Sequence, residues 1–152
     1  DDLLDQSHYS YPQLLYKPTS GKDAIDADII FDKKTGTYYL YYKDEDNATI
    51  CYVTSKNLTG PYSDASNPTK VLTSDVALEG CNSYFLNGTD TLVMLADAYL
   101  NGYFVLNISK DFQNFSTLDN SETTINECQP RHGSVISISD AEYDILVSEF
   151  GI

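Results

Sequence analysis

Short runs of β-branched and aromatic residues, separated by polar turns, dominate the hydrophobic pattern of the chain. Residues 29–31 and 37–42 form two such runs around a polar turn that contains Gly36, and residues 48–54 form a third run. Runs of this length and composition are typical of β-strands, and two of them around a glycine-containing loop predict a hairpin. The pattern therefore predicts an antiparallel sheet in the first part of the chain.

The same order of strands and turns recurs further along the chain. A second set of three strands is predicted over residues 83–86, 91–96 and 102–108. Thr37 corresponds to Thr91 and Ser55 corresponds to Ser109, and both pairs are 54 residues apart. A repeat of about 50 residues built from short strands is typical of the blades of a β-propeller.

A third unit begins with another inner-strand pattern, which runs from Arg131 to Ile138. Ser139 and Glu142 then form an S-x-x-E capping box, which predicts a short C-terminal helix. The predicted fold class is all-β: a partial β-propeller of about two and a half blades of four-stranded antiparallel sheets, followed by the helix. We expect a single domain, with blade-like units over residues 24–72, 77–119 and 130–152.

Composition narrows the classes of partner. The chain has 23 acidic and 9 basic residues and a formal net charge of −14, so we expect neither nucleic-acid nor membrane-surface binding. Its three cysteines form no CxxC pair, which disfavours a zinc site and leaves one disulfide or three free thiols as alternatives. Five Asn-x-Ser/Thr triplets favour an extracellular location without establishing it.

Three polar residues open the three predicted inner strands at equal spacing. Asp26, Glu79 and His132 are successively 53 residues apart. Because the first strand of each propeller blade lines the central axis, residues in the same phase converge there. The alternative is that each is a strand-start polar group satisfied by its own turn. Three residues in phase favour a site that contains two carboxyl groups and an imidazole.

The segments around these residues resemble the five-bladed propellers of glycoside hydrolase family 43, which groups arabinanases, arabinofuranosidases and xylosidases. The segments that carry the resemblance are Ala24–Ile29, Leu78–Cys81, Pro130–Val135 and the turn Ser55–Tyr62. They look like the family's Ile-Asp-Pro strand, Glu-Gly-Pro strand, Arg-His-Gly-Ser strand and inter-strand turn. Ala27 and Cys81 stand where the first two family motifs have proline.

The resemblance implies a role for each residue in the hydrolysis of arabinose- or xylose-containing polysaccharides or oligosaccharides with inversion. Glu79 matches the general acid, and Asp26 matches the carboxylate that orients this acid and raises its pKa by like-charge repulsion. Arg131 is expected to bind a sugar hydroxyl or a charged ring substituent. His132 matches the axial histidine that binds water or a metal ion such as calcium, and the implied reaction requires no cofactor. Asp28 is a further expected substrate-binding residue, and it is the alternative candidate for the role of the carboxylate that orients the general acid.

The catalytic base of the family lies on its first blade, and the 25 residues before Asp26 contain no matching motif. The sequence thus resembles the C-terminal half of a family-43 enzyme. We expect the chain alone to be inactive and to be completed by the missing N-terminal blades or by a self-association partner. Asp97, at the end of a predicted strand, either reaches the neighbourhood of the general acid or caps a turn, and the turn cap is the favoured interpretation. A non-catalytic carbohydrate-binding propeller is the alternative function, and a purely structural β-domain is the third hypothesis.

Overall fold

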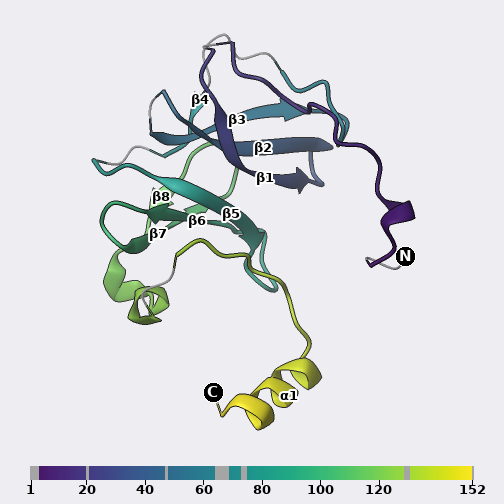
Figure 1. Ribbon diagram of the computed structural model, residues 1–152. Coiled ribbons are helices and arrows are strands. Elements are labelled where there is room, and N and C mark those ends of the chain that lie inside the picture. The colour runs from purple at the N-terminus through teal and green to yellow at the C-terminus, as the bar shows by residue number, and fades with distance from the viewer. Residues whose placement is uncertain are drawn as a thin grey trace.

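Two four-stranded antiparallel sheets form the centre of the computed structural model (Figure 1). The structure describes residues 4–19, 21–46, 48–63, 69–72, 75–128 and 131–151. The first sheet has the order β1 (Ala24–Asp32), β2 (Thr37–Asp44), β3 (Thr49–Ser55) and β4 (Thr69–Lys70). The second has the order β5 (Glu79–Phe85), β6 (Leu92–Ala98), β7 (Tyr103–Ser109) and β8 (Ser116–Thr117). The strands predicted in the first two units and the β-rich fold class are confirmed.

Helices are short and lie before the first sheet or after the second sheet in the sequence. They are the 3-10 turns η1 (Gln6–His8), η2 (Asn120–Glu122) and η3 (Ile125–Cys128) and the α-helix α1 (Asp140–Phe150). The predicted capping box is present at α1, where Ser139 and Glu142 exchange hydrogen bonds at the N-terminus. Figure 1 shows α1 apart from both sheets, and none of its residues is buried. None of the helices in the described ranges has the length and apolar character needed to cross a bilayer.

The inner strand predicted from Arg131 to Ile138 is not formed. Residues 131–139 belong to no strand, and they contact β5 and the turn after it through hydrogen bonds with Asn82 and Asn87. Val135 donates its backbone N–H to the side chain of Asn82, and the hydroxyl of Ser137 lies 3.3 Å from Asn87 Oδ1. A strand requires a backbone ladder with a partner, and the residues that follow fold into α1 instead. Within the predicted unit 130–152, residues 130 and 152 lie outside the described residues.

The two sheets repeat one another with an offset of 54 residues. Ile25 pairs with Lys43 in the first sheet, and Glu79 pairs with Asp97 in the second. In both sheets the register then shifts by one residue, immediately after Ile25 and after Glu79. Both inner strands therefore carry a β-bulge at the same place, which bends the strand and redirects its side chains.

The main hydrophobic core lies between the sheets. Its members come from both of them and include Tyr39, Tyr41, Ile50, Leu92, Met94 and Ala96. Tyr41 and Met94 are fully buried, and the hydroxyl of Tyr41 donates to the carbonyl of Phe112 at 2.7 Å. A second cluster covers the other face of the first sheet, where Tyr16 from the N-terminal segment packs on Tyr42 with ring centroids 5.3 Å apart. Cys51 and Cys81 are buried free thiols.

Candidate active site

The residues that the sequence places in phase do come together. One ligand atom each from Asp26, Glu79 and His132 lies within 4.8 Å of the other two. Asp26 belongs to β1, Glu79 begins β5, and His132 follows η3, so the cluster joins three segments that are far apart in sequence. The side chain of Glu79 is 15% exposed and that of His132 is 47% exposed. Solvent and small molecules can therefore reach the cluster from the His132 side.

The bulge in β1 turns Asp26 toward the second sheet. Asp26 has a φ of +52°, a left-handed conformation that Asp tolerates better than most residues. Its Oδ2 accepts the backbone N–H of Gly80 at 3.0 Å. The predicted 53-residue equivalence of Asp26 and Glu79 is wrong, because the ladders align Glu79 with Ile25 and Asp26 with Gly80. The bulge, rather than strand phase, brings the two carboxyl groups together.

Gly80 occupies the equivalent position in β5, and no side chain fits there. Its φ is +59°, and a Cβ atom on it would lie 2.9 Å from Nδ1 of His132. Such a distance is closer than real Cβ contacts allow. The imidazole therefore lies directly against the backbone of the β5 bulge, and a larger residue at this position would strain the backbone and displace His132.

Two basic groups and an imidazole surround the Glu79 carboxylate. Oε1 lies 3.0 Å from Nε2 of His132 and 3.7 Å from a guanidinium nitrogen of Arg131, and Oε2 accepts from Nζ of Lys43 at 3.1 Å. Burial raises the pKa of Glu79, but the hydrogen bonds from His132 and Lys43 outweigh it and hold that pKa below its usual value. The expectation that a neighbouring carboxylate raises the pKa of Glu79 is wrong. In this arrangement Glu79 is ionised at neutral pH.

Lys43 is a site residue that the sequence reasoning missed. Its side chain is 5% exposed and also contacts Oε1 of Glu45 at 3.1 Å and the ring of Tyr99 at 4.6 Å from the centroid. A signal was present in the sequence, because the 54-residue repeat aligns Lys43 with Asp97. A lysine in a tyrosine-rich strand is otherwise typical of a solvated face.

Asp97 lies in β6 with a fully buried side chain, so its interpretation as a turn cap is wrong. Its Oδ2 accepts from Nε of Arg131 at 2.9 Å and lies 3.7 Å from Nε2 of His132. Its Oδ1 is buried and has no hydrogen-bond partner among the described residues. Asp97 therefore anchors the guanidinium of Arg131, whose side chain remains 56% exposed.

A family model described as "Probable glycosyl hydrolase domain", related to glycoside hydrolase family 43, matches residues 4–144. The chain belongs to this family. The predicted resemblance to glycoside hydrolase family 43 is thereby confirmed. No curated protein matches this glycosyl hydrolase domain in sequence.

A solved structure of a family-43 β-1,3-galactosidase with galactodeoxynojirimycin is similar to this glycosyl hydrolase domain, with a TM-score of 0.43 and 15% sequence identity. The similarity covers 70% of this chain and 36% of that chain. This chain thus spans well under two thirds of the length of that galactosidase.

In this glycosyl hydrolase domain, Asp28 links the two sheets beside the cluster. One of its carboxylate oxygens accepts from the backbone N–H of Ser83 at 2.8 Å and from the Ser83 hydroxyl, and the other lies 3.5 Å from Nδ2 of Asn82. These contacts tie β1 to β5 two residues beyond the β1 bulge. They occupy much of the hydrogen-bonding capacity of this carboxylate, so binding of substrate by Asp28 stays a prediction.

The donor set of the cluster is small for a cation site. It offers one oxygen each from Asp26 and Glu79 and one nitrogen from His132, whereas calcium takes six to eight oxygen ligands. The Glu79 oxygens also contact Lys43 and His132 within 3.1 Å, and cationic Arg131 lies beside them. The residues present do not fit calcium, and the chemistry of this glycosyl hydrolase domain is derived without a metal.

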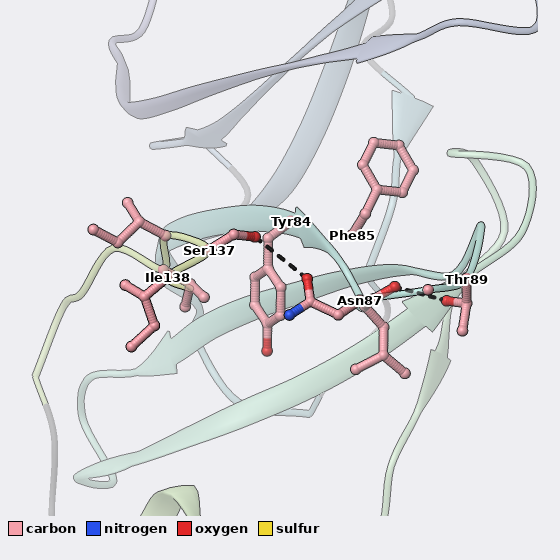
Figure 2. A pocket seen from close by; sticks show the side chains of 10 residues that line it. Tyr84, Phe85, Asn87, Thr89, Ser137 and Ile138 are labelled. Atoms are coloured by element: carbon pink, nitrogen blue, oxygen red, sulfur yellow. Dashed lines mark hydrogen bonds between the residues drawn. The ribbon is translucent and has the colours of Figure 1, made fainter. Parts of the chain in front are cut away.

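A separate cavity lies at the other end of β5. It has a volume of about 470 Å³ and is lined by the end of β5, the following turn and residues 135–138. Figure 2 shows Tyr84 and Ile138 beside it, with the bond between Ser137 and Asn87 closing one side. None of the predicted site residues lines this cavity.

Proposed function

We propose that this glycosyl hydrolase domain provides the acid side of an inverting glycosidase site for arabinose- or xylose-containing polysaccharides or oligosaccharides. The observation that carries the proposal is the convergence of Asp26, Glu79 and His132 from three distant segments. Membership of a family related to glycoside hydrolase family 43 supports the same reaction class. Inversion requires one carboxyl group that protonates the leaving oxygen and another that activates water.

Glu79 is the proposed general acid. Its Oε1 faces the accessible side of the cluster, beside His132 and Arg131. Because the contacts with His132 and Lys43 lower its pKa, the protonated fraction increases as the pH falls toward and below the usual glutamate range. We therefore expect an acidic pH optimum for the acid-catalysed step. Asp26 accepts a hydrogen bond from the backbone N–H of Gly80 and so orients the backbone next to Glu79.

Arg131 and His132 are the proposed sugar-binding groups, with Asp28 beside them. The guanidinium of Arg131 is anchored by Asp97 and still half exposed, so its remaining N–H groups can donate to a sugar hydroxyl or to a charged ring substituent. The partly exposed imidazole of His132 is suited to bind water or a hydroxyl at the mouth of the cluster.

The proposed base lies outside this set of residues. Asp28 is held by Ser83, Asp97 by Arg131, and Asp26 by the Gly80 N–H, so none of them is placed to activate a water molecule freely. We expect a further set of blades or a second copy of the chain to supply the base, and we expect no hydrolysis by the chain alone.

A non-catalytic carbohydrate-binding module is the second candidate, and the lowered pKa of Glu79 favours it. An ionised carboxylate accepts hydrogen bonds from sugar hydroxyls, but it does not donate the proton that glycosidic cleavage needs. The same cluster would then bind sugars without cleaving them.

Hydrolysis of 4-nitrophenyl α-L-arabinofuranoside and β-D-xyloside tests the proposal. The assay compares the chain alone with the complete product of its gene between about pH 4 and pH 8. We expect cleavage only by the complete product, reduced at least about 100-fold by Glu79→Gln and unchanged by Glu149→Gln, which removes an exposed carboxylate on α1. Sugar binding without cleavage in both forms supports the binding module. If the chain and the complete product neither bind nor cleave these sugars, both functions are contradicted.

A further inference from the structure

The 54-residue repeat places opposite charges at one ladder position of the two sheets. Lys43 pairs with Ile25 in the first sheet, and Asp97 pairs with Glu79 in the second. Each of the two charged side chains reaches the next segment along the chain: Lys43 contacts Glu79 at 3.1 Å, and Asp97 contacts Arg131 at 2.9 Å. In both sheets, the charged residue at this ladder position thus binds a charged side chain of a later segment, which is β5 in the first case and the segment with Arg131 in the second.

Three groups fix Lys43 at this position. They are Glu79 on β5, Glu45 just after β2 and the ring of Tyr99 just after β6. A lysine ammonium is a compact charge on a long, rotatable stem, and holding it in place usually costs side-chain entropy. With 5% exposure and contacts from both sheets, this ammonium has little freedom to move away from Glu79.

The contacts of Glu79 are divided between its two oxygens. Oε2 accepts from Lys43 on the buried side, and Oε1 faces His132 and Arg131 on the accessible side. The contact with Lys43 on one oxygen therefore favours an orientation of the carboxylate in which the other, equivalent oxygen faces His132. Stability alone does not require this ion pair. Exchange of both partners of a buried ion pair for apolar side chains of similar volume often leaves the stability of a protein unchanged.

We propose that Lys43 is a positioning residue, which holds Oε2 of Glu79 so that Oε1 is presented to His132 and to a sugar bound there. The last part of this inference rests on the proposed function of the cluster. The first part, the placement of the Glu79 carboxylate against His132, concerns the free chain and can be measured without any sugar.

Nuclear magnetic resonance of the imidazoles tests the placement directly, because His8 and His132 are the two histidines of the sequence. The full chain is labelled with ¹⁵N-histidine, and its Nε2 and Hε1 signals are recorded at a fixed, neutral pH. We expect Lys43→Met to shift the His132 signals and to leave those of His8 in place. We expect Lys43→Arg to keep the His132 signals close to their positions in the original chain. Lys33→Met, at an exposed lysine, is the matched control and should leave both histidines unchanged.

A folded Lys43→Met chain with unchanged His132 signals overturns the proposal. If Lys43→Met does not fold, Lys43→Gln provides the same comparison, since glutamine keeps a polar head but no charge, and unchanged His132 signals again overturn it.

Titration with L-arabinose and D-xylose separates the two claims. A shift of His132 in the variant, with no sugar bound by the original chain, supports the positioning role and contradicts the proposed function. If the original chain binds sugar, we expect Lys43→Met to weaken binding about tenfold; equal affinity of the two chains contradicts the positioning role.

Discussion

The two sheets share one backbone plan and differ at three positions that matter for chemistry. Each has four antiparallel strands in sequence order and a bulge at the same place in its inner strand. Where the first sheet has Ile25, Asp26 and Lys43, the second has Glu79, Gly80 and Asp97. The repeated scaffold therefore sets the geometry, and the residues at the bulge and its ladder partner make one edge of the molecule a site.

The sheets also differ in what covers their equivalent faces. The face of the first sheet that carries Tyr39 and Tyr41 packs against the whole second sheet in a large apolar core. The equivalent face of the second sheet contacts residues 131–138 instead. These contacts include hydrogen bonds with Asp97, Asn82 and Asn87. Segments with few apolar contacts open at low free-energy cost. Arg131 and His132 therefore lie on the less firmly held side of the site.

The largest effect is expected where the two sheets meet. Met94→Ala removes a fully buried side chain from the shared core and should lower the free energy of unfolding by about 2–5 kcal/mol. Urea unfolding followed by far-ultraviolet circular dichroism measures this change. Leu100→Ala, at a residue that is 74% exposed, serves as the control. Separate unfolding transitions for the two sheets would contradict a shared core.

Exchange of the β5 bulge glycine tests the bulge itself. Gly80→Ala forces an alanine to a φ of +59° with its Cβ against the His132 ring, and we expect a loss of about 1–3 kcal/mol in stability together with a shift of the His132 resonances. Gly133→Ala is the matched control, since a Cβ there meets nothing within 4 Å. Equal effects of the two substitutions would show that the bulge does not constrain the site.

The contribution of Glu79 to stability should depend on acid pH, whereas that of its counterpart Ile25 should not, because Ile25 does not titrate. The pKa of Glu79 is lower in the folded chain than the ordinary pKa value of a glutamate side chain, so the unfolded state binds the proton more readily. The resulting stabilisation is complete above that value and is lost as the pH falls through the folded pKa. Urea midpoints measured from pH 6 down to pH 2.5 should therefore fall less steeply in Glu79→Gln; parallel curves for both chains contradict this ionic environment.

The smallest effect is expected at the exposed bridge between the two sheets. Asp90, in the β5–β6 turn, contacts Lys34 at 2.6 Å and Lys110 at 3.0 Å, and these contacts lower its pKa. All three side chains are well exposed, so water and salt screen the charges. We expect Asp90→Asn to leave the melting temperature unchanged at high salt, in contrast to Asp97→Asn. A clear drop at high salt would show that this bridge stabilises the pairing of the sheets.

Much of this arrangement is readable from the sequence because the strands are rich in Tyr, Ile and Val and recur at a fixed period. The two-residue strands β4 and β8 carry no such pattern, so the prediction of four-stranded blades gave no position for the fourth strand. The spacing of 53 residues predicted that Asp26, Glu79 and His132 come together, and they do, but it gave an incomplete reason. An aspartate with positive φ leaves no mark in the sequence, and only the bulge explains why Asp26 and Glu79 meet.

The charged partners were harder to predict for a different reason. Lys43 and Asp97 are each the last residue but one of a mostly apolar strand, and their burial depends on the packing of the two sheets and of the segment with Arg131. The segment 131–139 shows the opposite case. Its composition is typical of a strand, but composition cannot provide the partner that a ladder needs.

Titration of the chain with L-arabinose and D-xylose, followed on the side-chain resonances of the site, tests the central claim most directly. Arg131 is the single arginine of the sequence, so its Nε–H signal identifies itself, and His8 is an internal reference for His132. We expect the signals of Arg131 and His132 to shift together and saturate, and we expect Glu79→Gln to abolish the response. No shift at either residue, or shifts that persist in Glu79→Gln, would contradict a sugar-binding site at this cluster.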